Sequence, residues 1–311
     1  MKAVLPALAR PLLEPHLPAG LDIAWFASAQ QAREMIADAD IAWVDMQPPS
    51  ETAAAIAAGQ RLKWVSTIYA GVDAFDLPRL KALGAVLTNG AGINAVAVAE
   101  YAVMGMLVAA KRYDQVVRQA DRQEWTIAAP GTVELEDTSA LIIGYGTIGR
   151  LIGDRLRAFG VQVTGVTRTG RDDTLTPDQW RGRIGAFDWI VLAAPATTDT
   201  HALIGADEIA AMKPGAWLIN MARGDMVDQD ALIAALSARR IAGAFLDTVT
   251  PEPLPAGHPL WTTPNAIHSM HLSGRSQTQM FQRGAALFLR NLSAFLSGNP
   301  LQNRVDLDAG Y

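Results

Sequence analysis

One glycine-rich turn constrains the fold of this chain more than any other feature. Residues 141–149 read LIIGYGTIG, a short apolar run followed by Gly144, Gly146 and Gly149 in G-x-G-x-x-G spacing. A helical pattern continues over 150–159. A strand, a tight turn and a helix in this order are the context of a dinucleotide-binding fingerprint.

Each glycine of the turn has its own physical role. Gly144 allows the sharp turn, and Gly146 lets a pyrophosphate approach the backbone because it has no Cβ. Gly149 lets the helix pack closely on its strand. The helix N-terminus offers N–H groups and a partial positive charge to phosphates. We therefore expect a dinucleotide cofactor, the alternative being an ordinary glycine-rich turn of an α/β protein.

Length and composition exclude several classes of protein. The 311 residues suffice for two domains, and 50% hydrophobic with 18% charged residues is typical of an ordered chain. A net charge of −5 gives no basic footprint for a nucleic-acid partner. The absence of cysteine excludes disulfides and thiolate metal sites, and we expect no metal site.

The N-terminus and the hydropathy pattern bear on location. The first 20 residues are apolar but contain four prolines, so we interpret them as a first strand and a loop rather than a signal peptide. Apolar runs stay shorter than a membrane span. We expect a cytoplasmic protein that acts without a membrane.

Strand-like and helix-like segments alternate along the chain, which predicts α/β architecture with parallel sheets and helices on both faces. The expected strands of the first third are 2–5, 23–26, 41–44, 62–67 and 86–88, with helices at 29–37, 52–59 and 78–83. Six more strands are expected at 140–143, 161–166, 189–193, 217–220, 242–246 and 266–268, with a last helix at 277–296.

We expect two domains, each a Rossmann-like doubly wound sheet. Residues 96–284 would form the dinucleotide-binding domain. Residues 1–95 and 285–311 would form a discontinuous substrate domain, because the tail after the last helix is too short to fold alone.

The segment 94–112, NAVAVAEYAVMGMLVAAKR, predicts a long helix that begins at Asn94. It is apolar nearly all round, so it must be buried. It is either a core helix or a helix that links the domains and packs against a second subunit. We favour the second interpretation, and hence a homodimer.

The residues after the second strand of the nucleotide domain bear on cofactor choice. NAD sites usually carry an acid there for the ribose 2′-OH. Here Thr167 and Arg168 follow the strand, then Thr169 and Arg171, and the first carboxylate is Asp172. A guanidinium can bind a 2′-phosphate through charge-assisted hydrogen bonds. We predict NADPH (NADP⁺), with NAD(H) weaker, unless Arg168 is an ordinary solvated arginine.

Three later strand ends carry reactive side chains, and parallel strands deliver their carboxyl ends to one edge. Arg223 follows 217–220 and could bind a substrate carboxylate. Glu252 lies shortly after 242–246, and His271 follows the last strand. The histidine could exchange a proton at a carbonyl oxygen while the glutamate holds its ring. Any one of these residues alone would more often be structural.

The chain resembles the D-isomer-specific 2-hydroxyacid dehydrogenases over nearly its whole length. The matching segments are YAGVD at 69–73, Asn94 with VAE at 98–100, GYGTIG at 144–149, NMARG at 220–224, LD at 246–247, EPLP at 252–255, HPLW at 258–261, PN at 264–265 and His271. The family usually has Thr-Pro-His where this chain has Ser269-Met270-His271.

The resemblance implies two Rossmann-like domains with the active site in the cleft between them, and usually a dimer around helix 94–112. It implies that Arg223, Glu252 and His271 are catalytic. Substrate would bind at Ala70, Gly71, Val72 and Arg223. The cofactor would contact Gly144, Gly146, Thr147, Ile148, Gly149, Thr167, Arg168, Thr169, Arg171, Pro195, Ala222 and Asp247, the last at the nicotinamide carboxamide.

His268 is the competing histidine. We place only one of residues 268 and 271 toward the cleft, because three steps along a strand reverse the face.

The Thr167-Arg168 pair resembles the NADPH-preferring glyoxylate and hydroxypyruvate reductases. We therefore expect reduction of a small 2-keto acid to the D-2-hydroxy acid. The alternatives are a formate- or phosphite-type dehydrogenase and a non-enzymatic dinucleotide-sensing corepressor.

Overall fold

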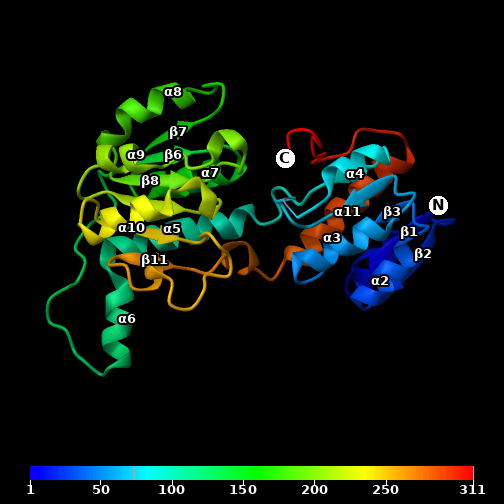
Figure 1. Ribbon diagram of the computed structural model, residues 1–311, viewed down its shortest axis with the longest axis horizontal. Helices are drawn as coiled ribbons and strands as arrows, with labels where there is room; N and C mark the ends of the chain where they lie inside the picture. Colours follow the sequence, from blue (N-terminus) through cyan, green and yellow to red (C-terminus); the bar gives the residue numbers. More distant parts are fainter. Residues whose placement is uncertain (73, 311) are drawn as a thin grey trace. The chain divides into compact units, whose positions relative to one another are not determined.

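The computed structural model describes residues 1–72 and 74–310, so Asp73, the last residue of the YAGVD segment, lies outside it together with Tyr311. The chain forms two compact units, one of Met1–Asn94 with Gln277–Tyr311 and one of Ala95–Ser276. Each unit holds one parallel sheet flanked by helices (Figure 1). The predicted α/β class with two doubly wound parallel sheets is confirmed.

The first unit has a five-stranded sheet in the order β2-β1-β3-β4-β5, with every pair parallel. Its strands are β1 (Lys2–Pro6), β2 (Asp22–Phe26), β3 (Ile41–Ala42), β4 (Trp64–Ser66) and β5 (Val86–Thr88). The order reverses between β1 and β3. The carboxyl edge beside such a reversal is where ligands bind in doubly wound sheets.

Helices cover both faces of this sheet because successive strand residues point to opposite sides. Val4, Val65 and Leu87 pack toward α2 (Ala29–Ile36), α3 (Pro49–Ala58) and α4 (Leu77–Ala82). Leu5, Ile41 and Trp64 pack toward α1 (Arg10–Leu13) and α11 (Met280–Leu296).

The chain returns to the first unit at Gln277, earlier than the expected boundary at 284/285. The reason is the start of α11: the Arg283 guanidinium donates to the carbonyl oxygen of Ile93 at 3.2 Å, and a Cβ built at Gly284 would lie 2.6 Å from the Ile68 side chain. Further along α11, Phe288 stacks on Trp64 of the five-stranded sheet with ring centroids 5.0 Å apart.

The expected loop after the first strand is wrong. Residues 7–16 form the helical turns η1 (Ala7–Ala9), α1 and η2 (Glu14–His16). Pro11 and Pro15 stand at the starts of these turns, where a missing N–H and a fixed φ do no harm. Leu13 is fully buried, so the segment contributes to the core.

The second unit has a six-stranded sheet in the order β11-β10-β9-β8-β6-β7, again parallel throughout. The strands are β6 (Ser139–Ile143), β7 (Gln162–Val166), β8 (Trp189–Leu192), β9 (Trp217–Asn220), β10 (Gly243–Leu246) and β11 (Ala266–His268). The order reverses between β6 and β8, so the glycine-rich turn after β6 lies at the switch point.

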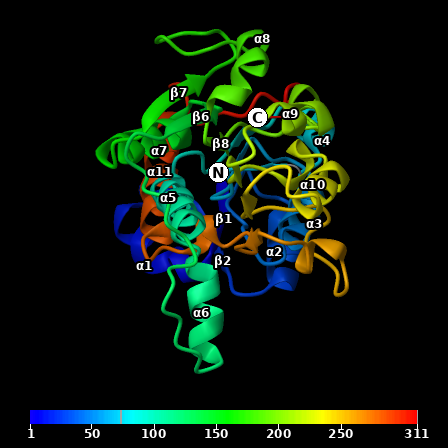
Figure 2. The same ribbon diagram turned by 90° about the vertical axis from the view of Figure 1, so that its left-hand side faces the viewer.

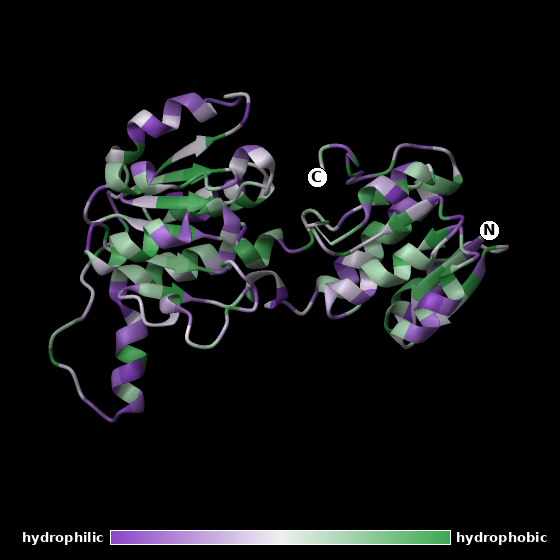
Figure 3. Cartoon of the chain, viewed as in Figure 1, coloured by the Kyte–Doolittle hydropathy of each residue, from purple (hydrophilic) through white to green (hydrophobic). Residues whose placement is uncertain are grey.

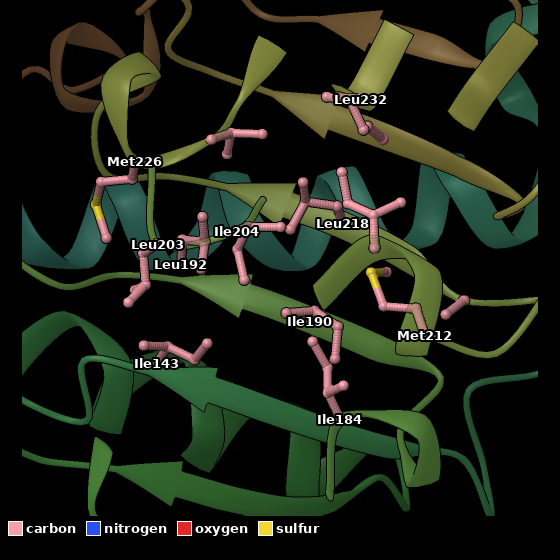
Figure 4. Packing of buried hydrophobic residues seen from close by; sticks show 14 of the residues in the cluster. Ile143, Ile184, Ile190, Leu192, Leu203, Ile204, Met212, Leu218, Met226 and Leu232 are labelled. Atoms are coloured by element: carbon pink, nitrogen blue, oxygen red, sulfur yellow. The ribbon is translucent and has the colours of Figure 1, made fainter. Parts of the chain in front are cut away.

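Two apolar layers sandwich this sheet. One contains α5 (Ala95–Lys111) and α7 (Thr147–Ala158), and the other α8 (Pro177–Trp180), α9 (Ala206–Ala211) and α10 (Gln229–Ser237). Figure 4 shows the second layer, where Ile190 and Leu218 of the sheet face Met212 and Leu232. Hydrophobic residues gather along the strands of both units (Figure 3).

Short 3-10 helices lie in the loops between the later strands of the second unit and after the last one. They are η3 (Arg181–Ala186), η4 (Thr198–Thr200), η5 (Gly224–Met226), η6 (Pro259–Trp261) and η7 (Ser273–Arg275).

One helix of the second unit, α6 (Tyr113–Asp121), projects away from the sheet in both views (Figures 1 and 2). The chain after it carries Trp125 and Ile127, which are 94% and 99% exposed. We call α6 and residues 122–134 the arm.

Within residues 1–72 and 74–310, the helices are all too short or too polar to cross a membrane.

Candidate active site

The glycine-rich turn has the geometry that a dinucleotide needs. Gly144 has φ +96°, and a Cβ built there would lie 2.3 Å from the backbone nitrogen of Ala194. A Cβ at Gly149 would lie 2.3 Å from the carbonyl oxygen of Gly144. A Cβ at Gly146 would meet nothing within 4 Å, so the space over this residue is open at the N-terminus of α7. Two glycines thus close the turn and one leaves room for a pyrophosphate.

Thr147 and Ile148, the first residues of α7, belong to the same turn. Pro195 lies in the loop after β8, across the switch point, where its carbonyl oxygen accepts a hydrogen bond from the Thr200 hydroxyl at 2.9 Å. These positions agree with a cofactor lying along the carboxyl edge of β6 and β8.

The loop after β7 holds the residues predicted to select the cofactor. Thr167 binds the Thr174 hydroxyl at 2.7 Å, and its backbone N–H donates to Leu175 at 3.0 Å. Arg168, Thr169 and Arg171 are exposed on this loop.

Sequence reasoning missed one cation at this loop. Arg150, in the first turns of α7, pairs with Asp172 at 2.5 Å, and its guanidinium lies 5.4 Å from the Tyr145 ring centroid. The nearest carboxylate of the loop is thus neutralised by a guanidinium. The position of Arg150, directly after the last glycine of the motif, was the signal that could have found it.

Arg223 is placed by a turn that its neighbours close. The Asn220 side chain accepts from the backbone N–H of Ala222 at 3.0 Å and donates to the carbonyl of Arg223 at 2.8 Å. A Cβ at Gly224 would lie 2.1 Å from the carbonyl carbon of Val249. The NMARG segment therefore folds as one tight unit that holds the half-buried Arg223 after β9.

His271 and Glu252 form a pair. Nδ1 of His271 lies 2.6 Å from Oε2 of Glu252, and Oε1 of Glu252 accepts the backbone N–H of Val249 at 3.1 Å. Burial acts to raise the pKa of the Glu252 carboxyl, but the bond and charge of His271 and the charge of Arg223 together hold the pKa below its usual range. The structure thus brings together Arg223, Glu252 and His271 within the second unit.

His271 does not lie in a strand, and the argument from strand alternation is corrected here. Strand β11 ends at His268, and Met270 and His271 form a turn with φ +54° and +53°. A proline ring fixes φ near −65°, so this turn differs from the Thr-Pro-His pattern. Ser269 donates to Asp247 at 2.7 Å and so attaches the turn to the end of β10.

His268 faces a different environment. Its Nε2 lies 3.0 Å from the carbonyl oxygen of Leu260, and its ring stands edge-on to Trp261. Burial lowers the pKa of His268 and favours the neutral ring.

Asp247 is 2% exposed and accepts several bonds from the turn that carries His271. Its Oδ1 accepts the Ser269 hydroxyl and the backbone N–H of Leu272 at 3.1 Å, and its Oδ2 accepts the Ser273 hydroxyl. Asp247 therefore organises the turn that carries His271.

The predicted substrate loop belongs to the first unit. The carbonyl oxygen of Ala70 accepts the Asn89 side-chain N–H at 2.8 Å, and Val72 is 2% exposed. Gly71 lies between them, half-buried.

A dinucleotide turn at a switch point, with an arginine and a histidine–carboxylate pair after later strands of the same sheet, indicates a nucleotide-dependent oxidoreductase. Residues 103–273 match the family model for the D-isomer specific 2-hydroxyacid dehydrogenase, NAD binding domain. The human glyoxylate reductase/hydroxypyruvate reductase is 33% identical over 81% of this chain and 79% of its own.

Two solved structures extend the likeness to the whole chain. A D-isomer specific 2-hydroxyacid dehydrogenase family protein from Aeromonas salmonicida is 30% identical, with TM-score 0.87 and 99% of each chain covered. The NADPH-dependent glyoxylate/hydroxypyruvate reductase from Sinorhizobium meliloti, in complex with NADP and malonate, is 26% identical, with TM-score 0.78 over 99% of this chain and 97% of that one. The chain belongs to the D-isomer specific 2-hydroxyacid dehydrogenase family and is an NAD(P)-dependent enzyme of that family.

Proposed function

We propose that this enzyme reduces a small 2-keto acid of the glyoxylate or hydroxypyruvate type to the D-2-hydroxy acid with NADPH. The observation that carries the proposal is the 2.6 Å contact between His271 and Glu252, with the charge of Arg223 acting on the same carboxylate. An acid, its charged partner and an anion-binding guanidinium are what this reduction requires.

The bound dinucleotide supplies the hydride. Arg223 binds the substrate carboxylate and polarises the adjacent carbonyl, and the backbone N–H groups of Gly71 and Val72 bind the carboxylate. Glu252 engages Nδ1 of His271, so Nε2 is the nitrogen that gives its proton to the developing alkoxide oxygen. Asp247 binds the nicotinamide carboxamide.

The preference for NADPH rests on Arg168 and its neighbours Thr167, Thr169 and Arg171. The ion pair between Arg150 and Asp172 supports it, because it neutralises the carboxylate that would repel a 2′-phosphate. The Sinorhizobium meliloti relative, whose structure contains NADP, is in line with this preference.

We also propose that the enzyme is a homodimer built on α5 and the arm. Val103, Met104 and Leu107 of α5 line an apolar groove with Phe159 of α7. The exposed Trp125 and Ile127 of the arm add apolar surface within the same unit. A second copy that covers both would remove this area from water.

Substrate profiling tests the function. NADPH oxidation is measured with glyoxylate, hydroxypyruvate, pyruvate and bulkier 2-keto acids, and reduction of NAD⁺ or NADP⁺ with formate and phosphite. We expect turnover with the small keto acids. Turnover with formate or phosphite alone would indicate the rival dehydrogenase, and dinucleotide binding without turnover would favour the corepressor.

A further inference from the structure

Two carboxylates flank strand β3, and their partners differ in charge. Asp40, before the strand, is 1% exposed and pairs with Lys63 at 2.9 Å and Arg61 at 3.2 Å. Burial acts to raise its pKa, but the bonds from Lys2, Lys63 and Arg61 lower that pKa to about 2. Asp40 is an ion-paired carboxylate of a familiar stabilising kind.

Asp45, after the strand, is held by uncharged donors. It accepts the Trp43 indole N–H at 2.7 Å, the Thr67 hydroxyl at 2.6 Å and the backbone N–H of Ile68 at 2.6 Å. Burial outweighs these bonds and raises the pKa of Asp45 to about 6. A desolvated carboxylate without a cation among these donors reduces stability, and such groups concentrate at functional sites.

The bonds of Asp45 lead directly into the substrate loop. Thr67, whose hydroxyl donates to Asp45, accepts the backbone N–H of Tyr69 on the same oxygen at 3.1 Å. The Tyr69 hydroxyl donates to the carbonyl oxygen of Met46, the residue after Asp45, at 2.6 Å. Asp45 and its neighbour therefore fix residues 67–69, immediately before Ala70, Gly71 and Val72.

The other side of the loop is held by the turn after β5. The backbone N–H of Gly90 donates to the carbonyl oxygen of Tyr69 at 2.8 Å, and the Asn89 side chain donates to that of Ala70 at 2.8 Å. A Cβ at Gly90 would lie 2.1 Å from the carbonyl oxygen of Ile68. Residues 67–70 are thus held from two sides, by the bonds that start at Asp45 and by the turn after β5.

We propose that Asp45 is a positioning residue for substrate binding: by holding Thr67 and Ile68 it orients the backbone N–H groups of the Gly71 loop toward the carboxylate of the keto acid. The inference rests on the proposed function of that loop. The loop follows β4 at the carboxyl edge of the sheet, next to β3, the strand that borders the switch point. Small fixed differences in backbone orientation there change ligand affinity.

Steady-state kinetics test the role. In Asp45→Asn, the amide nitrogen replaces one acceptor, so a donor from Thr67, Trp43 or Ile68 faces another donor. We expect the KM for the keto acid to rise about ten- to a hundredfold, the scale of one lost hydrogen bond to a charged group. The kcat and the KM for NADPH should stay within about threefold, because the nucleotide unit is untouched.

Asp40→Asn is the matched control, a buried carboxylate at the other end of the same strand. It should lower the thermal midpoint without raising the KM for the keto acid. Thr67→Val is a second variant that removes the shared hydroxyl, and it should raise the KM in the same way if Asp45→Asn fails to fold. An unchanged KM in the variants that fold, or an equal rise in Asp40→Asn, would overturn the proposal.

Amide hydrogen exchange separates this inference from the proposed function. If the wild type reduces none of the keto acids, the proposed function has failed, and the role of Asp45 is tested by exchange alone. Amides of residues 68–72 should exchange at least about tenfold faster in Asp45→Asn than in wild type or Asp40→Asn, because their local opening becomes easier. Equal exchange in the three proteins would show that Asp45 does not position the loop.

Discussion

At the scale of single residues, the two nitrogens of the His271 ring have different environments. Nδ1 faces the Glu252 carboxylate at 2.6 Å, which leaves Nε2 for the substrate oxygen in the proposed reaction. His268, three residues earlier, uses Nε2 for the carbonyl oxygen of Leu260 at 3.0 Å. A carbonyl oxygen only accepts, so Nε2 of His268 carries a hydrogen, and this N–H is used in a structural hydrogen bond.

The two histidines should therefore respond differently to substitution. His271→Ala should lower kcat by about a hundredfold or more, the usual scale of general acid catalysis. His268→Gln, which keeps a donor near Leu260, should leave kcat within about threefold and lower the thermal midpoint. Turnover measured on both variants checks this. Loss of activity in His268→Gln with full activity in His271→Ala would reverse the assignment.

The pH dependence should depend on Glu252. Its pKa is lowered, so the carboxylate is predominantly ionised above its ordinary pKa of about 4.3 and places a negative charge beside Nδ1 of His271. Glu252→Gln removes that charge. The pH at which keto-acid reduction fades should then move lower, while the KM for NADPH stays nearly constant. A pH–rate profile identical to that of wild type would show that Glu252 does not hold the proton.

Arg168 should decide between the two dinucleotides. Arg168→Ala should weaken the binding of NADPH by about 1.5–3 kcal/mol, the value of a hydrogen bond between charged groups. The binding of NADH should stay nearly unchanged. Arg183→Ala, an exposed arginine of η3 in the same unit, is the control for net charge. The measurement is kcat/KM with each cofactor. Equal efficiency of wild type with NADPH and NADH would contradict the prediction.

At the scale of an element, the glycines of the turn between β6 and α7 have different roles: one leaves space for the cofactor, and another allows the close packing that stabilises the fold. A Cβ at Gly146 meets nothing within 4 Å, whereas one at Gly149 lies 2.3 Å from the carbonyl oxygen of Gly144. Gly146→Ala should keep stability within about 0.5 kcal/mol and raise the KM for NADPH. Gly149→Ala should reduce the free energy of unfolding by about 1–3 kcal/mol, as overpacking does.

Denaturant unfolding and cofactor titration of both variants check this pair. Gly182→Ala, where a Cβ also meets nothing within 4 Å, is the control for a change in open space. If Gly146→Ala binds NADPH like wild type, the pyrophosphate does not lie over this glycine.

At the scale of the whole molecule, the prediction concerns assembly. Light scattering should give about twice the chain mass of 33.2 kDa. Met104→Asp, in the α5 groove, and Trp125→Ala, in the arm, should each shift the protein toward monomer, because they remove apolar area from the interface. Leu8→Asp, at a 72% exposed leucine of the first unit, should leave the mass unchanged. A wild-type monomer at micromolar concentration would show that α5 is covered within one subunit.

Much of this architecture follows from local sequence alone. Strands such as Val86–Thr88 and Trp217–Asn220 agree with expectation to the residue, because buried parallel strands are short apolar runs between polar turns. The glycines at 144 and 149 also have the predicted roles, since φ and close packing at a tight turn depend on a few neighbouring residues. The strand-edge rule likewise selected Arg223, Glu252 and His271 from the order of the elements.

Other features depended on contacts that no local pattern specifies. The left-handed turn at Met270 and His271 is held by Asp247, more than 20 residues earlier, so strand periodicity could not find it. The helical turns at 7–16 form because Leu13 packs into a core completed by α11 from the far end of the chain. Asp45 meets Thr67 only because β3 and β4 are neighbours in the sheet.

The sequence by itself determined the elements and the chemistry at their ends, through short-range sterics and burial. The tertiary structure decided which distant side chains share a hydrogen bond, because sheet order sets those distances.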